Sequence, residues 1–193
     1  HLNDFLNSEY AENGVMAQPL TGTTLSNFAY LIQQSSTAEV VQWFDDVKSA
    51  GLGFAAGNAD AMRRVCAGDY AWCFTDTDDA AKAVVNGYPV AIHYLDQGIG
   101  ESGAMLIPNS ICLLEGAQEN EMAKKFIDYV VSAECELRLA HSTSAQIPLH
   151  SGITVPDGIL LPNRDYPVLD IPWVAVAAEL DGAASTFQKL FVR

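Results

Sequence analysis

Three carboxylates stand close together in the segment Phe74-Thr-Asp-Thr-Asp-Asp-Ala80, directly after the apolar run Tyr70-Ala-Trp-Cys-Phe74. Oxygen ligands at the end of a strand can hold a hard cation, and aspartates can also serve as nucleophile and acid/base in phosphoryl transfer. Acidic residues also stabilise the first turn of a helix, because its exposed N–H groups carry partial positive charge. Three interpretations of Asp76 and Asp78 therefore have to be compared.

The enzymatic interpretation is a haloacid-dehalogenase-like phosphatase. In that family a strand ends in Asp-x-Asp, and the first Asp attacks a phosphate with the help of magnesium while the second is the acid/base. Asp76 and Asp78 have this spacing. The family expects Thr or Val two residues after the second Asp and then an apolar residue, whereas this chain has Ala80 and Ala81. The structural alternative is that Asp76 or Thr77 caps the next helix.

A second cluster, Pro19-Leu-Thr-Gly-Thr-Thr24, stands just before a helix pattern. Hydroxyl groups and free backbone N–H groups at the positive end of a helix are a natural seat for a phosphate, carbonate or carboxylate. Thr21, Gly22 and Thr23 are therefore candidate anion-binding residues, and Asn58 has a similar place at another predicted helix start. An ordinary helix cap remains the alternative for each of them. In open α/β sheets, strand ends and helix starts meet in one crevice, which is where ligands bind.

The pattern along the chain is that of an α/β protein with helices covering a short sheet. Helix 119–131 is predicted to bury a stripe made of Met122, Ala123, Phe126, Ile127 and Val130. Asn58 is predicted to be the N-cap of its helix, and residues 141–172 are expected to wrap over the surface. The predicted helices are 23–34, 37–50, 58–66, 78–86, 119–131, 133–140 and 173–191, and the predicted strands are 52–55, 70–74, 89–95 and 104–114.

Composition excludes several classes of partner. The 193 residues are 49% hydrophobic and 18% charged, and the net charge of −14 repels nucleic acid and anionic lipid surfaces. No apolar run reaches the roughly 20 residues that span a bilayer, and the N-terminal segment lacks the pattern of a signal peptide. The four cysteines allow two disulfides or four buried thiols, and they do not have zinc-ligand spacing.

The order of several short motifs resembles a known family, the solute-binding proteins of bacterial ABC importers, and within it the ferric-iron type. The resemblance runs through most of the chain. It is carried by the segments 16–24 (MAQPLTGTT), 56–58 (AGN), 75–80 (TDTDDA), 87–90 (GYPV), 96–97 (DQ), 106–109 (LIPN), 115–117 (EGA), 125–129 (KFIDY), 132–134 (SAE) and 145–149 (AQIPL).

The resemblance implies an exported, periplasmic or extracellular protein without catalytic activity. It implies the type 2 periplasmic-binding-protein fold, in which two lobes close on a small solute that is passed to an ABC permease in the membrane. Residues 1–97 would form the second lobe, 98–150 the hinge crossover and the segment that completes the first lobe, and 151–193 a C-terminal wrap and helix. The chain would then be a C-terminal fragment, and its exposed apolar surface is expected to form a homodimer.

The resemblance also assigns roles to residues. In iron-binding members the loop that matches Thr21, Gly22 and Thr23 holds a synergistic anion, with help from an asparagine that matches Asn58. The strand end that matches residues 75–78 carries a pair of tyrosines that bind ferric iron, and this chain has Asp76 and Asp78 there instead. We expect the solute to be a small anion or a metal-containing molecule, with Asp76 and Asp78 as candidate metal ligands. A phosphorylated or amine-bearing organic solute is an equal alternative.

Overall fold

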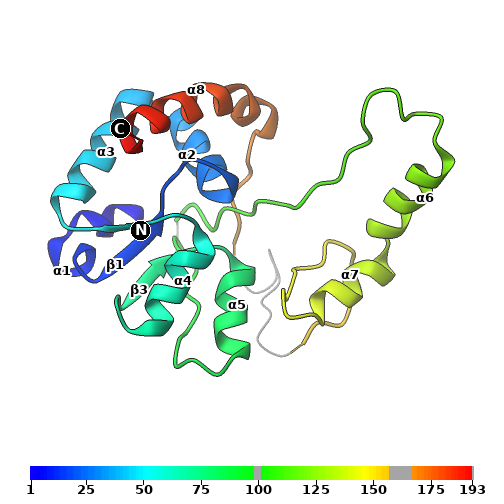
Figure 1. Ribbon diagram of the computed structural model, residues 1–193, viewed down its shortest axis with the longest axis horizontal. Coiled ribbons are helices and arrows are strands. Elements are labelled where there is room, and N and C mark those ends of the chain that lie inside the picture. Colours follow the sequence, from blue (N-terminus) through cyan, green and yellow to red (C-terminus); the bar gives the residue numbers. More distant parts are fainter. Residues whose placement is uncertain (98–100, 157–166, 193) are drawn as a thin grey trace.

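The computed structural model describes residues 1–97, 101–156 and 167–192 (Figure 1). The N-terminal part holds η1 (Leu2–Leu6), α1 (Ser8–Ala11), β1 (Gly14–Ala17), α2 (Gly22–Gln34), α3 (Thr37–Ser49), β2 (Gly53–Ala55), α4 (Asn58–Ala67), β3 (Trp72–Phe74) and α5 (Thr77–Val85). It is followed by α6 (Glu121–Val130), α7 (Ala133–Ala140) and the long C-terminal α8 (Trp173–Phe191).

The sheet has three parallel strands in the order β2-β1-β3. Each strand leads directly into a helix, so that β1 precedes α2, β2 precedes α4 and β3 precedes α5. Alternate residues of the central strand β1 face opposite sides. Met16 belongs to the larger apolar cluster, whereas Val15 packs with Ala55 and with Ala61 of α4. Helices therefore cover both faces of the sheet, as is usual for parallel strands.

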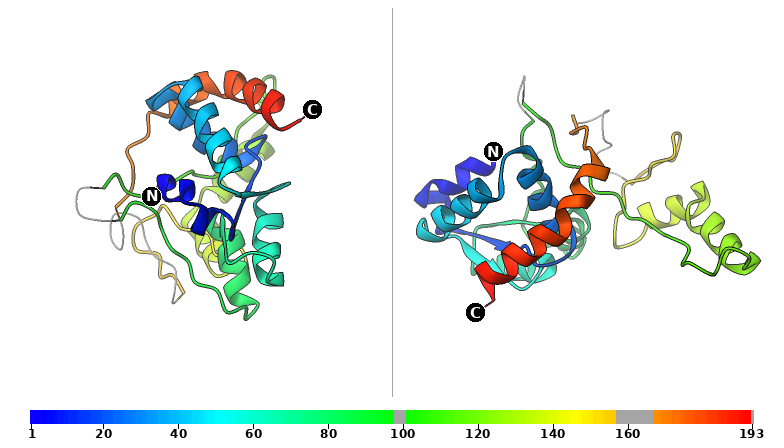
Figure 2. Two further views of the ribbon diagram at one scale, coloured as in Figure 1. Left: turned by 90° about the vertical axis from the view of Figure 1, so that its left-hand side faces the viewer. Right: turned by 90° about the horizontal axis from the view of Figure 1, so that it is seen from above.

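The larger core is built on aromatic side chains. Phe28 of α2, Phe44 of α3 and Phe187 of α8 are each 0% exposed, and the ring centroids of Phe28 and Phe44 are 4.5 Å apart. Full burial of a phenylalanine contributes up to about 3 kcal/mol. Because α8 packs along α2, the C-terminal helix closes the core of the N-terminal part (Figure 2).

The elements from η1 to α5 and the helix α8 pack together and form the body of the molecule. Residues 106–150 extend away from this body and form a projecting arm that carries α6 and α7 (Figures 1 and 2). The predicted helices of the arm are confirmed, but the predicted buried stripe of α6 is wrong. None of the ten residues of α6, all of them described, is buried, and Met122 and Phe126 are 72% and 61% exposed. The stripe is apolar, yet the body has no surface facing it. Dimerisation through this surface stays a prediction, which light scattering can test.

The predicted strands 89–95 and 104–114 do not form, although the structure describes both segments throughout. A strand requires a hydrogen-bonding partner, and only Ala104 has one, in an isolated parallel bridge to Val168. This bridge holds two passing segments side by side where the arm leaves the body and where the chain returns. Residues 157–166 of the predicted wrap 141–172 lie outside the described residues.

The other predicted elements are confirmed to within three residues, and α8 has the predicted bounds. The strand β1 and the short helices η1 and α1 were not predicted. Gly68 ends α4 in the left-handed conformation with φ of 84°, as expected for a glycine after a helix. Within the described ranges, no helix has both the length and the apolar character needed to cross a membrane.

Candidate functional site

The carboxyl ends of the three strands point to the same edge of the sheet, and three helices begin there. The helix α2 starts at Gly22, α4 at Asn58 and α5 at Thr77. Helix starts carry unpaired backbone N–H groups, so this edge concentrates hydrogen-bond donors. It is the place where ligands bind in open α/β sheets.

Three of the predicted site residues meet at this edge. The Asp76 Oδ2 atom accepts hydrogen bonds from Asn58 Nδ2 at 2.7 Å and from Thr23 Oγ1 at 3.2 Å. The same amide nitrogen of Asn58 lies 2.8 Å from Thr23 Oγ1. One residue from each of the three strand–helix junctions therefore takes part in a single network, which fixes the position of the Asp76 carboxylate.

Asn58 does not cap α4 as predicted, because Gly57 occupies the N-cap position and Asn58 is the first helical residue. The Asn58 side chain instead reaches across to α2. Its Oδ1 atom accepts a hydrogen bond from Thr24 Oγ1 at 3.0 Å, and Thr24 is only 5% exposed. Sequence reasoning missed this role of Thr24. The threonines within residues 21–24 indicated that a hydroxyl group takes part in the site. Their spacing alone does not predict which of the hydroxyl groups is buried.

Asp78 lies close to Asp76, and Asp79, which was not among the predicted site residues, joins them. One carboxylate oxygen from each of the three residues lies within 4.8 Å of the other two. Burial, followed by the neighbouring charge of Asp76, raises the pKa of Asp79 to about 6 and also raises the pKa of Asp78. Each residue is in the first turn of α5 or at its N-cap, yet the side chain of Asp76 does not cap the helix.

The second oxygen of Asp76, Oδ1, is buried and has no hydrogen-bond partner among the residues that the structure describes. A carboxylate oxygen removed from water is costly unless something positive or protonated meets it. A proton shared with Asp78 or Asp79 would satisfy it, and so would a cation. The electrostatics of this cluster therefore favour a positively charged group beside Asp76.

Thr21 and Gly22 are placed differently. Thr21 is exposed and begins α2 without a side-chain hydrogen bond to the helix. Gly22 has φ of 65°, a conformation that glycine adopts without strain, and a Cβ at this position would meet nothing within 4 Å. The structure thus brings Thr23, Asn58, Asp76 and Asp78 together, while the side chain of Thr21 stands apart. An anion at this helix start would be bound through backbone N–H groups.

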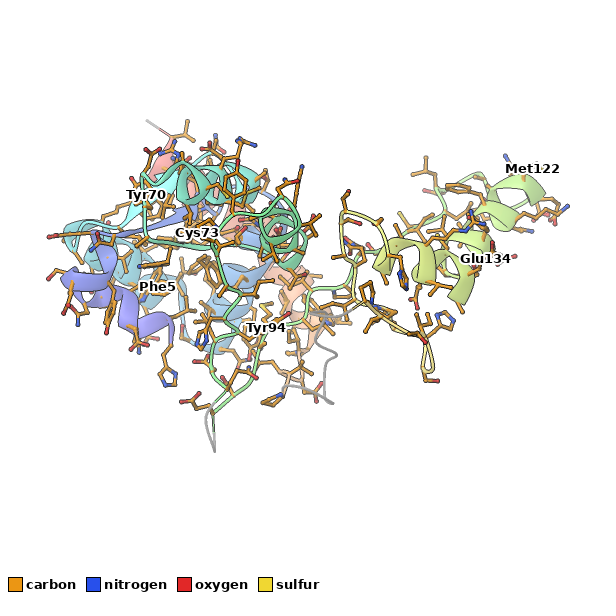
Figure 3. The ribbon with its side chains drawn as sticks, turned by 90° about the horizontal axis from the view of Figure 1, so that it is seen from below. Phe5, Tyr70, Cys73, Tyr94, Met122 and Glu134 are labelled. Carbon is orange, nitrogen blue, oxygen red and sulfur yellow. The ribbon has the colours of Figure 1, made fainter. Side chains whose placement is uncertain are left out.

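The network forms part of the wall of a cavity of about 1060 Å³. Its wall includes the site residues Thr23, Asn58 and Asp76, sulfur-containing residues of α4 and β3, and residues 89–95 and 102–107. This volume is at the upper end for a small-molecule site. Tyr94 lines the same cavity from the segment after α5 (Figure 3).

A second group of possible metal ligands is made of His1, Asp96 and Glu101, of which His1 and Asp96 line the same cavity. His1 is 2.6 Å from Asp96 through Nδ1 and 2.9 Å from Glu101 through Nε2. Its side chain is 54% exposed, and both ring nitrogens already face a carboxylate. These residues come from the N-terminus and the segment after α5, and not from the helix starts that follow the strands.

A scan against protein-family profiles and a search of curated proteins found no match. Among solved structures, the chain is similar to iron-bound HitA from Pseudomonas aeruginosa, with a TM-score of 0.75 and 16% identity over 99% of this chain and 61% of that chain. It is equally similar to the ferric binding protein from Campylobacter jejuni, with a TM-score of 0.75 and 16% identity over 100% of this chain and 63% of that one.

This similarity establishes the fold. The chain has the type 2 periplasmic-binding-protein fold expected from the motif order, and it spans 61% and 63% of the length of the two structures that it matches. Their identity to this chain is low, so the role of the strand-end site has to be argued from its own residues.

Proposed function

We propose that this chain is the solute-binding part of an ABC importer and that it works outside the cytoplasmic membrane. The observation that supports this most directly is the meeting of Thr23, Asn58 and Asp76 at the carboxyl edge of the sheet. The fold adds support, because the two similar structures are described as iron-bound and as a ferric binding protein. In this proposal the chain binds a solute and catalyses no reaction.

The chemistry of the site points to a solute with positive charge, such as a metal ion. Thr23 and Asn58 direct their side-chain donors at Asp76, so these groups are committed to a carboxylate of the protein itself. Asp76 Oδ1 remains available, and Asp78 and Asp79 add negative charge beside it. Carboxylate oxygens suit hard cations. A small anion bound at the start of α2 would then accompany the metal.

Terbium(III) is a suitable probe for a hard oxygen-ligand site, because its luminescence is sensitised by nearby tryptophan. We expect the purified chain to bind terbium, and Asp76→Asn to weaken the binding by about tenfold or more. Asp69→Asn is the matched control, since it removes one exposed carboxylate and leaves the site intact. Equal affinities of the two variants would contradict a site at Asp76.

The phosphatase interpretation makes the opposite prediction for catalysis. It requires magnesium-dependent turnover of a generic phosphate ester, and this turnover would be lost in Asp76→Asn. We expect no turnover above the buffer rate in the wild-type chain. Magnesium-dependent turnover that disappears with Asp76 would replace the solute-binding proposal.

A further inference from the structure

Three sulfur-containing residues, none of them part of the carboxylate network, line the cavity. Met62 and Cys66 are four residues apart in α4 and share one face of the helix, and the Cys66 Sγ atom lies 3.6 Å from the Met62 Sδ atom. Cys73 is the middle residue of β3, against which α4 packs (Figure 3). All three residues line the same cavity.

The electrostatic potential around these sulfur atoms is negative, and the atoms are partly shielded from water. Burial, followed by the neighbouring charges of Cys66, Asp79 and Asp76, raises the pKa of Cys73 to about 11. The Cys66 thiol is thus close enough to Cys73 for its charge to be felt there. Both thiols are free, and Met62 is 8% exposed. A cation that enters the cavity meets two thiols and a thioether in a region of negative potential.

We propose that Met62, Cys66 and Cys73 form a binding site for a soft monovalent cation of the Cu(I) class. Thiolate and thioether sulfurs are the ligands that select Cu(I), whereas the carboxylates nearby suit hard cations. A spacing of 3.6 Å between two sulfurs lets both contact one ion. Binding exchanges protons for the metal: each cysteine that ligates the ion releases one proton, and the oxidation state of copper does not change.

The site shares no ligand with the carboxylate network, although both face one cavity. Its ligands come from the middle of β3 and from the length of α4, whereas the network lies at the strand ends and helix starts. A soft cation and a hard cation should therefore bind without replacing each other. Failure of copper binding would leave the terbium result unaffected, and the reverse also holds.

The first test is a competition titration of the full, reduced chain with Cu(I) and a chromogenic Cu(I) chelator. We expect one equivalent of Cu(I) to be withheld from the chelator. Cys66→Ser and Cys73→Ser should each weaken binding by about tenfold or more, and Met62→Leu by a smaller factor. Cys112→Ser is the matched control, because Cys112 is an exposed thiol on the arm. Unchanged affinity in the Cys66→Ser, Cys73→Ser double variant would overturn the proposal.

A second test needs no substitution and so does not depend on folding of the variants. One equivalent of silver(I), a redox-inert substitute for Cu(I), is added before alkylation of the thiols, and each cysteine is read by peptide mass spectrometry. We expect silver to protect Cys66 and Cys73 and to leave Cys112 as reactive as before. Equal protection of all four cysteines, or none, would show that the contact between Met62 and Cys66 is only packing.

Discussion

Asn58→Ala is the substitution that bears most directly on the network at the strand ends. It removes the amide that donates to Asp76 Oδ2 at 2.7 Å and the carbonyl oxygen that accepts from Thr24 Oγ1 at 3.0 Å. Of the two donors to Asp76 Oδ2 named above, Thr23 remains. The Thr24 hydroxyl is left buried without its acceptor.

The expected loss follows from these contacts. A hydrogen bond to a charged group contributes about 1.5–3 kcal/mol, and a buried hydroxyl without a partner costs about 1–3 kcal/mol. The lower ends apply here because Asp76 is only partly buried. The better helix propensity of alanine offsets about 0.5 kcal/mol. The net loss is therefore about 2 kcal/mol, which for a chain of this size lowers Tm by about 4–8 °C.

The assay is chemical and thermal unfolding followed by circular dichroism, with Asn3→Ala as the control on an exposed position. Adding Asp76→Ala completes a double-mutant cycle. We expect Asn58 and Asp76 to be coupled by about 1–2 kcal/mol, since each is the other's partner. Additivity of the two losses within about 0.5 kcal/mol would refute the network, even if each variant alone is destabilised.

Four further substitutions have expected outcomes. The folded chain favours the protonated form of Asp79, whose pKa is raised from 3.8 to about 6. Asp79→Asn should therefore leave stability unchanged below pH 3.8, raise Tm increasingly between pH 3.8 and 6, and give a constant gain above that range; a pH-independent difference would contradict this. Gly14→Ala places a Cβ inside the indole of Trp72 and should lower the free energy of unfolding by about 1–3 kcal/mol. Gly182→Ala, with open space around it in α8, should raise the free energy of unfolding by about 0.5–1 kcal/mol. Urea unfolding of both variants tests these opposite changes. Phe126→Lys on the exposed face of α6 should change the free energy of unfolding by less than about 0.5 kcal/mol, and a larger loss in urea unfolding would mean that the side chain is buried.

Sequence patterns predicted the helices well because helix signals are local. The hydroxyl of Ser36 caps α3 and Gly68 ends α4, and both signals are visible within one turn of the element they bound. The strands were predicted less well. The central strand β1 has only four residues, all buried, and its pairing with β2 and β3 depends on residues far along the chain. Conversely, segment 104–114 has the composition of a strand and finds almost no partner.

Contacts between residues far apart in the sequence also limited the prediction of the site. The rule that strand ends and helix starts share one edge predicted that Thr23, Asn58 and Asp76 would meet. It does not predict the direction of the hydrogen bonds between them. Only the three-dimensional arrangement shows that the donors predicted to hold an external anion are turned toward Asp76 instead. Because these donors are occupied by Asp76, we propose a positively charged solute. The arrangement also adds Thr24 and Asp79 to the candidate site.

In the proposed function, the Asp76 carboxylate at the tip of β3 holds a positively charged solute. An anomalous-difference map from crystals of the chain soaked in terbium(III) tests this at the atom concerned. We expect a strong peak within about 2.5 Å of Asp76 Oδ1, the usual range for a large hard cation and a carboxylate oxygen. Peaks confined to other acidic groups, such as Asp96 and Glu101 beside His1, would contradict it.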